Sequence, residues 1–306
     1  MPLLMDGNRV RDQIQEELRP RIARLRAAGR PPGLAVVLVG NHPASETYVR
    51  SKIKTSQDLG MCAEKISPPE TAGTEALLEI VDTLNARADV DGILVQLPLP
   101  PQVDAHRILL AVSPEKDVDG FHPYNTGCLV AKLPAPRPCT PAGIIQLLKR
   151  YQIEIAGKRA VVAGRGDIAG KPAALMLLHE NATVAICHSK TRDLAAVCRE
   201  ADILVAAAGR PGLITADCIK PGATVIDVGI NSLEKREDVA RIFRNSAEKL
   251  AAFDRKGSVL VGDVDPVAVV EKSGAYTPVP GGVGPLTIAM LMVNTVECAE
   301  RRLGVC

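Results

Sequence analysis

Three polar side chains recur along one predicted helix and could carry proton chemistry. Ser45, Tyr48 and Lys52 stand at positions i, i+3 and i+7 of a helix predicted over residues 44–60, so they share one face. Burial lowers the pKa of a lysine, and a neutral amine can act as a base. A tyrosine ring can stack on a flat substrate. By spacing alone, a solvated helix face is an equally good interpretation.

Further polar side chains stand after buried strands. Gln96 lies at the end of a strand predicted over residues 90–97, where open α/β sheets bind ligands, although an amide in an edge loop is the structural alternative. The loop 116–122 holds Asp117 and Asp119, which could grip a heterocycle that offers several N–H donors. A calcium loop needs more oxygen ligands, so no metal is predicted, and Asx turns remain the alternative.

A glycine turn follows the apolar strand predicted over residues 159–163. Gly164, Gly166 and Gly170 allow a sharp bend or the close approach of a ligand. The helix that begins near Gly170 offers unpaired N–H groups and a positive dipole end to a phosphate. Because the spacing is one residue longer than the usual dinucleotide fingerprint, a plain strand–turn–helix is the alternative.

The segment after the next strand, residues 187–192, indicates which nucleotide would bind. An acid at this place in a nucleotide-binding sheet holds the ribose hydroxyls, whereas basic or hydroxyl residues accept a 2′-phosphate. No acid occurs before Asp193, and four residues suit phosphate, namely His188, Ser189, Lys190 and Arg192. The segment therefore favours NADP over NAD. Thr191 as a helix cap is the structural alternative for part of it.

The run Thr277–Pro285 is hard to explain as structure alone. Three glycines and three prolines in nine residues fix an unusual backbone path. Stretches of this kind line sites where the main chain touches a ligand.

Composition excludes several classes of protein. The 306 residues are 46% apolar and carry a net charge of +2, with three phenylalanines, four tyrosines and no tryptophan. Nucleic-acid binding through stacking and phosphate neutralisation is therefore not expected. No apolar run reaches the ~18–20 residues of a membrane span, and no secretory signal is predicted. Eight scattered cysteines without Cys-x-x-Cys indicate reduced thiols in a cytoplasmic protein.

The apolar pattern predicts an α/β protein of two domains. From residue 142 helices and apolar strands alternate, which predicts a doubly wound parallel sheet. The predicted helices cover residues 6–28, 44–60, 80–88, 106–110, 142–151, 171–179, 193–200 and 286–302. The predicted strands cover residues 34–39, 90–97, 159–163, 182–187, 202–207, 223–228 and 260–264. Residues 111–141 are expected to form loops, and residues 232–256 an extra charged helical segment.

These motifs together resemble the bifunctional methylenetetrahydrofolate dehydrogenase/cyclohydrolase family. The collinear stretches that carry the resemblance are Asn41–Lys52, Gly92–Pro100, Pro114–Asn125, Pro138–Gly143, the glycine turn, Cys187–Thr191, Val225–Asn231 and Thr277–Thr287. The resemblance implies NADP-dependent oxidation of 5,10-methylenetetrahydrofolate to the 5,10-methenyl cation, then hydrolysis to 10-formyltetrahydrofolate, within one-carbon metabolism. It also implies a homodimer.

The resemblance also implies roles for individual residues. Lys52 is expected to be the acid/base group of ring opening, Tyr48 to stack on the aminobenzoate ring, Gln96 to hold the lysine and Asp119 to bind the pterin. The remaining predicted folate contacts are Leu97, Val279, Pro280, Gly281 and Gly282. The predicted cofactor contacts are Gly164, Arg165, Gly166, Ile168, Gly170, His188, Ser189, Lys190, Arg192, Ala208, Gly209 and Ile230.

The expected domains follow from the same resemblance. Residues 1–140 and 280–306 would form an α/β folate-binding catalytic domain closed by the last helix. Residues 141–279 would form a Rossmann-type NADP domain with the insert at 232–256, and folate would bind in a cleft between the domains.

Three departures from the family pattern stand out. Gly166-Asp167 occupies a place where the family commonly has serine, and a carboxylate beside a pyrophosphate is unfavourable unless it points away or caps the helix. Pro266 stands where an aromatic residue is common, and the insert is longer than the family connection. A dehydrogenase without cyclohydrolase activity and a nucleotide-sensing protein on the same fold are the alternative functions.

Overall fold

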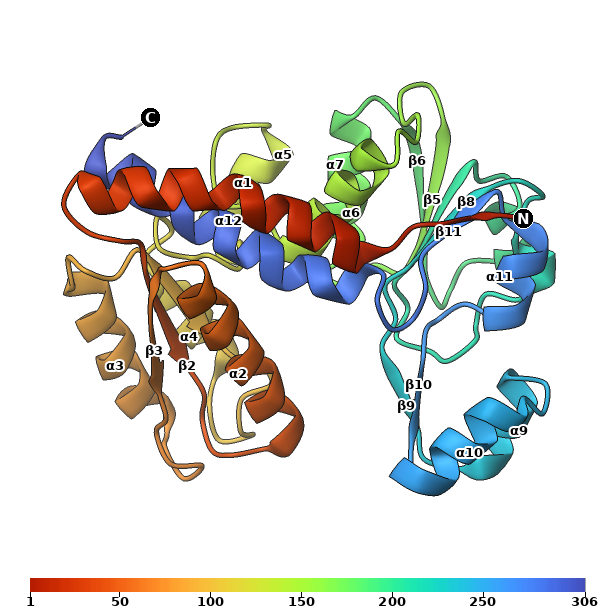
Figure 1. Ribbon diagram of the computed structural model, residues 1–306, viewed down its shortest axis with the longest axis horizontal. Coiled ribbons are helices and arrows are strands. Elements are labelled where there is room, and N and C mark those ends of the chain that lie inside the picture. The colour runs from red at the N-terminus through yellow and green to blue at the C-terminus, as the bar shows by residue number, and fades with distance from the viewer. Residues whose placement is uncertain (306) are drawn as a thin grey trace. The chain divides into compact units, whose positions relative to one another are not determined.

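The computed structural model describes residues 1–305, except for the side chains of Pro43 and Ala44. The chain forms two compact units (Figure 1). The six-stranded unit comprises Met1–Arg11 and Thr140–Thr287, and the three-stranded unit comprises Asp12–Cys139 and Ile288–Cys306. No helix in the described residues is both long and apolar enough to cross a lipid bilayer.

The six-stranded unit is built on a parallel sheet of order β1-β11-β8-β7-β5-β6. Its strands are β1 (Leu3–Leu4), β5 (Arg159–Ala163), β6 (Thr183–Cys187), β7 (Ile203–Ala206), β8 (Thr224–Asp227) and β11 (Ala275–Tyr276). The doubly wound parallel sheet is confirmed. The two-residue strands β1 and β11 were not predicted, because so short a stretch carries no alternation that could distinguish it from a loop.

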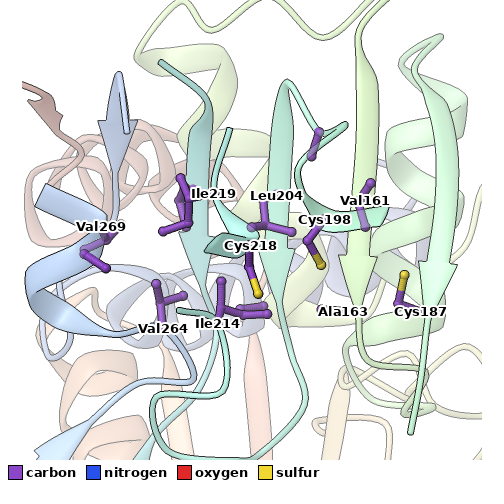
Figure 2. Close-up of a cluster of buried hydrophobic side chains, with 14 residues drawn as sticks. Val161, Ala163, Cys187, Cys198, Leu204, Ile214, Cys218, Ile219, Val264 and Val269 are labelled. Atoms are coloured by element: carbon purple, nitrogen blue, oxygen red, sulfur yellow. The ribbon is translucent and has the colours of Figure 1, made fainter. Parts of the chain in front are cut away.

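Helices cover this sheet and bury its apolar side chains. They are α6 (Cys139–Arg150), α7 (Gly170–His179), α8 (Leu194–Cys198), the 3₁₀ turn η1 (Ala216–Cys218) and α11 (Pro266–Lys272). Figure 2 shows one face of the core, where Cys198 and Cys218 pack beside Leu204 of β7. These cysteines are free and buried. They act as small apolar side chains in the core.

The predicted insert is a separate lobe of the same unit. It consists of β9 (Asn231–Leu233), α9 (Arg236–Ile242), α10 (Ala247–Lys256) and β10 (Val259–Val261). The helical pair has its own small core around Leu233, Val239 and Val261. The strand predicted at 260–264 is observed as Val259–Val261 and pairs antiparallel with β9 rather than joining the large sheet, because Val259 and Val261 are buried in the core of this lobe.

The three-stranded unit holds a parallel sheet of order β3-β2-β4. Its elements are β2 (Gly33–Val37), α2 (Pro43–Asp58), β3 (Cys62–Ile66), α3 (Thr74–Ala86), β4 (Gly92–Val95), α4 (Ala105–Ala111) and α5 (Pro123–Val130). Two predictions were wrong here, and one strand was missed. The edge strand β3 was missed because its polar sequence, Cys-Ala-Glu-Lys-Ile, lacks an apolar run. Helix α3 begins at Thr74 rather than residue 80, and α5 lies within the predicted loop 111–141 because Pro123 starts it at N1.

Two long helices, α1 (Gly7–Ala27) and α12 (Val283–Leu303), lie side by side (Figure 1). Within the three-stranded unit, Arg21 of α1 forms a paired contact with Glu300 of α12. The buried Asp91 accepts hydrogen bonds from both Arg30 and Arg302. Arg302 thus fastens the end of α12, and Arg30 the segment after α1, to the residue that precedes β4.

The predicted domain limits differ from the compact units at two places. Residues 1–11 belong to the six-stranded unit, because β1 pairs with β11 and Gly7 N donates to Gly281 O at 2.8 Å. Residues 280–287 belong there too, because the run that begins at Thr277 is bonded to β8. The predicted limits place both segments in the catalytic domain.

Candidate active site

Helix α2 positions the lysine that was predicted to act as acid and base. The Lys52 ammonium lies 5.4 Å from the centre of the Tyr48 ring, as expected for residues one turn apart. Only 6% of Lys52 is exposed, whereas 36% of Tyr48 is exposed. The tyrosine ring is therefore open to a flat ligand, while the ammonium beside it is shielded from water.

Gln96, which follows β4, contacts this lysine. Lys52 Nζ donates a hydrogen bond to Gln96 Oε1 at 3.0 Å across 44 residues of sequence. Gln96 Nε2 in turn donates to Leu97 O at 2.7 Å, which turns the amide oxygen toward the lysine. A neutral acceptor thus holds the ammonium without neutralising its charge.

The two acids of the 116–122 loop have different surroundings. Asp117 is buried and accepts hydrogen bonds from Gly120 N, His122 N and Asn125 Nδ2 at 3.1, 2.8 and 2.9 Å. Asp119 is half-buried and accepts no hydrogen bond within the described part of the chain. Burial raises the pKa of Asp119 to about 6, a rise that the charge of Lys52 opposes and that of Asp117 increases.

The first residue of that loop is structural. Lys116 is 1% exposed, and its ammonium donates to Leu84 O, Asn85 O and Arg87 O at 3.1, 2.7 and 2.7 Å. These are carbonyl groups at the end of α3, which a cation satisfies. Lys116 therefore anchors the loop and has no part in binding a ligand.

A buried amide of α12, which was not predicted from the sequence, holds the same loop. Asn294 Nδ2 donates to Val118 O at 2.7 Å and to Arg137 O at 2.8 Å, and Cys139 Sγ donates to Val118 O at 3.3 Å. Burial and the nearby Asp119 raise the pKa of the Cys139 thiol. The only sequence signal was one asparagine in the apolar stretch of the last helix.

A hollow opens at the carboxyl ends of β2 and β4, where ligands bind in open α/β sheets. It measures about 500 Å³. Its lining residues are Val39, Gly40, Asn41, His42, Ser45, Glu70, Pro98, Leu99 and Pro100. Ser45, the first residue of the predicted α2 face, thus lies in this hollow.

In the six-stranded unit, the glycine turn has the geometry of a phosphate loop. Gly164 has φ +139°, and a Cβ there would lie 1.9 Å from Ala207 O; at Gly170 it would lie 2.4 Å from Gly164 O. Helix α7 starts at Gly170 behind Ala169, which gives no side-chain cap. Lys171 N donates to Gly166 O at 3.1 Å and Pro172 has no N–H, so the Gly170 N–H is the group of the first turn that can face an anion at the positive end of the helix. Arg165, Gly166 and Ile168 of the turn are exposed.

The acid in this turn pairs with a lysine in the first turn of α7 and is open to solvent. Asp167 pairs with Lys171 at 2.5 Å, and 86% of its side chain is exposed. It does not cap α7. The carboxylate thus lies in solvent beside an opposite charge, which lessens the predicted conflict with a pyrophosphate.

The basic segment after β6 folds into a tight turn. His188 N donates to Thr191 Oγ1 at 2.9 Å, and Lys190 N donates to His188 Nδ1 at 3.1 Å. Ser189, Lys190 and Arg192 are exposed. Asp193, not Thr191, caps α8 by accepting from Ala196 N. Since the first acid is engaged as a cap, the exposed groups of the turn are basic or hydroxylic.

The remaining predicted contacts lie in loops of this unit. Ala208 and Gly209 follow β7, and Ile230, which is 56% exposed, follows β8. In the 277–285 run, Val279 is half-buried, Pro280 is exposed and Gly282 is buried. At Gly7, a Cβ would lie 1.7 Å from Gly282 O, so the start of α1 packs directly on this run.

Comparison with known proteins gives two matching family models. The catalytic domain of tetrahydrofolate dehydrogenase/cyclohydrolase matches residues 5–119, and the NAD(P)-binding domain of the same family matches residues 138–303. The bifunctional protein FolD of Solibacter usitatus is 72% identical over 306 residues, with both chains fully covered. FolD of Koribacter versatilis is 58% identical over 301 residues and 98% of each chain.

Solved structures agree with these relatives. The bifunctional enzyme FolD, a methylenetetrahydrofolate dehydrogenase/cyclohydrolase from Campylobacter jejuni, is 43% identical with a TM-score of 0.89, and covers 99% of this chain and 100% of its own. The Trypanosoma brucei enzyme, complexed with NADP cofactor and inhibitor, is 40% identical with a TM-score of 0.87 over 98% of both chains. The chain therefore belongs to the tetrahydrofolate dehydrogenase/cyclohydrolase family.

Proposed function

We propose that this chain oxidises 5,10-methylenetetrahydrofolate with NADP and hydrolyses the resulting 5,10-methenyl cation to 10-formyltetrahydrofolate. The observation that carries the proposal is the contact of Lys52 with Gln96, next to an unengaged Asp119, in a chain that also holds an NAD(P)-binding domain. Relatives of up to 72% identity are named bifunctional. Tetrahydrofolate derivatives are thus its substrates.

The residues of the six-stranded unit fit an NADP molecule. The Gly170 N–H and the positive dipole end of α7 suit the pyrophosphate, and the close approach at Gly164 leaves room only for glycine. The exposed Lys190 and Arg192 suit a 2′-phosphate. Bound NADP supplies the hydride acceptor. The chain itself has little to do in that step except align the two ligands, because the nitrogens flanking the reacting carbon stabilise the cation.

The hydrolytic step needs proton transfer, which the three-stranded unit can supply. Water adds to the amidinium carbon and gives up a proton; the carbon–nitrogen bond of the ring then breaks as the ring nitrogen takes a proton and the added hydroxyl becomes a carbonyl. Lys52 serves as the acid/base group, and Gln96 holds its ammonium at 3.0 Å. Asp119 binds N–H groups of the pterin, because its oxygens have no other donor in the described part of the chain.

A side-by-side assay tests this function. We expect methylenetetrahydrofolate oxidation to be faster with NADP than with NAD, and methenyl hydrolysis to proceed without either nucleotide. No oxidation with either nucleotide would overturn the enzyme assignment. Oxidation without hydrolysis would identify a monofunctional dehydrogenase, and a preference for NAD would overturn only the role given to residues 188–192.

The proposal includes a homodimer in the cytoplasm. Strand β6 is the last strand of its sheet, and Leu178 and Ile186 near this edge are 53% and 45% exposed. An unpaired edge with exposed apolar side chains favours pairing with a second copy. Ile186→Lys should shift the mass in light scattering to a monomer; an unchanged dimer would place the interface elsewhere.

Buried free thiols such as Cys198 and Cys298 support a reducing compartment.

A further inference from the structure

Asp263 is a fully buried acid whose carboxylate accepts hydrogen bonds from the turn after β7. Its exposure is 0%. Its carboxylate accepts from three consecutive backbone groups, Ala208 N at 2.6 Å, Gly209 N at 2.8 Å and Arg210 N at 2.8 Å. Asn231 Nδ2 adds a fourth hydrogen bond at 3.0 Å. Four donors satisfy both oxygens, so the turn is wrapped around this side chain.

A second buried acid fixes the backbone that carries Asp263. Asp227, at the end of β8, accepts from Gly229 N, Asp263 N and Val264 N at 3.0, 2.8 and 3.0 Å. Burial raises the pKa of Asp227 to about 7. The two acids thus link the ends of β7, β8 and β10.

The space around both acids leaves no room for adjustment. A Cβ on Gly229 would lie 2.4 Å from Asp263 Oδ1, and one on Gly262 would lie 1.8 Å from Asp227 Oδ2. Only glycine fits at either position, because real Cβ atoms do not come so close. The carboxylate of Asp263 is therefore held at one place relative to the turn.

This turn lies where a nucleotide would bind. β7 and β8 are parallel neighbours, and residues that follow their carboxyl ends face the ligand side of such a sheet. Ala208, Gly209 and Ile230, which were predicted as cofactor contacts, belong to the segments that Asp263 ties together through the Ala208–Arg210 amides and Asn231.

We propose that Asp263 is a positioning residue for NADP, which shapes the 208–210 turn and the segment around Asn231 to receive the cofactor. The inference rests on the proposed function, because it takes NADP as the ligand of this sheet. Asp263 acts through these backbone groups and not by touching the cofactor.

The variant Asp263→Asn tests this role at constant shape. Each oxygen of Asp263 accepts from two donors, so the new amide nitrogen faces two N–H groups that it cannot satisfy. We expect the Kd for NADP, measured by calorimetry, to rise about tenfold or more, since small displacements of ligand-holding groups have effects of this size. The KM for NADP should rise with it, while kcat changes less.

Two controls distinguish a specific loss of NADP binding from a general loss of the folded structure. Methenyl hydrolysis uses no nucleotide and depends on Lys52 in the three-stranded unit, so its kcat/KM should stay within about twofold of the wild-type value. Asp202→Asn is the matched substitution at the opposite end of the same sheet, where Asp202 accepts from Arg159 N and pairs with Lys220. It should leave the Kd for NADP unchanged.

The outcomes decide the inference. An unchanged Kd in Asp263→Asn, or an equal rise in Asp202→Asn, would overturn the positioning role. If Asp263→Asn fails to fold, Asn231→Ala removes only the side-chain donor and should raise the Kd about threefold; no rise there also overturns it. Wild-type protein that does not bind NADP would overturn the proposed function itself.

Discussion

The two acidic pairs of this molecule differ in how their oxygens are satisfied. In the six-stranded unit both Asp227 and Asp263 are enclosed by N–H donors. In the three-stranded unit Asp117 is enclosed in the same way, but Asp119, near Lys52, accepts no hydrogen bond from any residue that the structure describes. A satisfied buried carboxylate organises its loop, whereas an unsatisfied one keeps its acceptors for a ligand.

The largest expected effect concerns the lysine beside the free acid. Lys52→Met removes the acid/base group but keeps a long apolar side chain, so methenyl hydrolysis should fall about a hundredfold or more, while part of the dehydrogenase activity remains. Spectrophotometric assays of both steps check this. Equal loss of both activities, or of neither, would contradict the role given to Lys52.

Removing the enclosed acid of the loop should damage stability. Asp117→Ala leaves Gly120 N, His122 N and Asn125 Nδ2 without their acceptor. We expect the free energy of unfolding in urea to fall by about 2–4 kcal/mol. A loss below about 0.5 kcal/mol would show that water replaces the carboxylate and that the contrast between the two acids is not structural.

Removing Asp119, the acid without a hydrogen bond among the described residues, should raise the free energy of unfolding rather than lower it. The pKa of Asp119 is raised to about 6 from an ordinary 3.8, so the folded state holds its proton more tightly than the unfolded state. Its contribution to stability is full below about pH 4 and is lost as the pH rises through about 6. Asp119→Ala should therefore be more stable than wild type by about 1–3 kcal/mol near pH 8 and equal to it near pH 4.

Urea denaturation of Asp119→Ala and Asp117→Ala at both pH values measures this difference directly. Folate binding by Asp119→Ala should weaken although the protein is more stable. Residues of a functional site often lower stability in exchange for activity. Destabilisation of Asp119→Ala near pH 8 would show that its carboxylate is satisfied after all.

The smallest effect is expected at the exposed acid of the glycine turn. Asp167 is neutralised by Lys171 and points into solvent, where ion pairs contribute little. Asp167→Ser should change the Kd for NADP by less than about threefold. A tenfold tighter Kd would mean that this carboxylate does repel the pyrophosphate.

Features that repeat locally could be predicted from the amino-acid sequence. The spacing of Tyr48 and Lys52 placed them one turn apart, and the alternation after residue 142 predicted β5 to β8 within a few residues. Helical and strand periodicity is a property of the nearest neighbours in the chain, so a short window contains it. The polar edge strand β3 and the two-residue strands have no such pattern, and they were missed.

Which polar groups have hydrogen-bond partners could be seen only in the folded structure. Asp117 and Asp119 are two residues apart and look alike in the sequence, yet hydrogen bonds from Gly120, His122 and Asn125 separate their roles. Asp263 and Asn294 were not recognised, because their partners lie 53–55 and 157–176 residues away. Burial and hydrogen-bond satisfaction depend on which distant segments the fold brings together, and no local pattern records that.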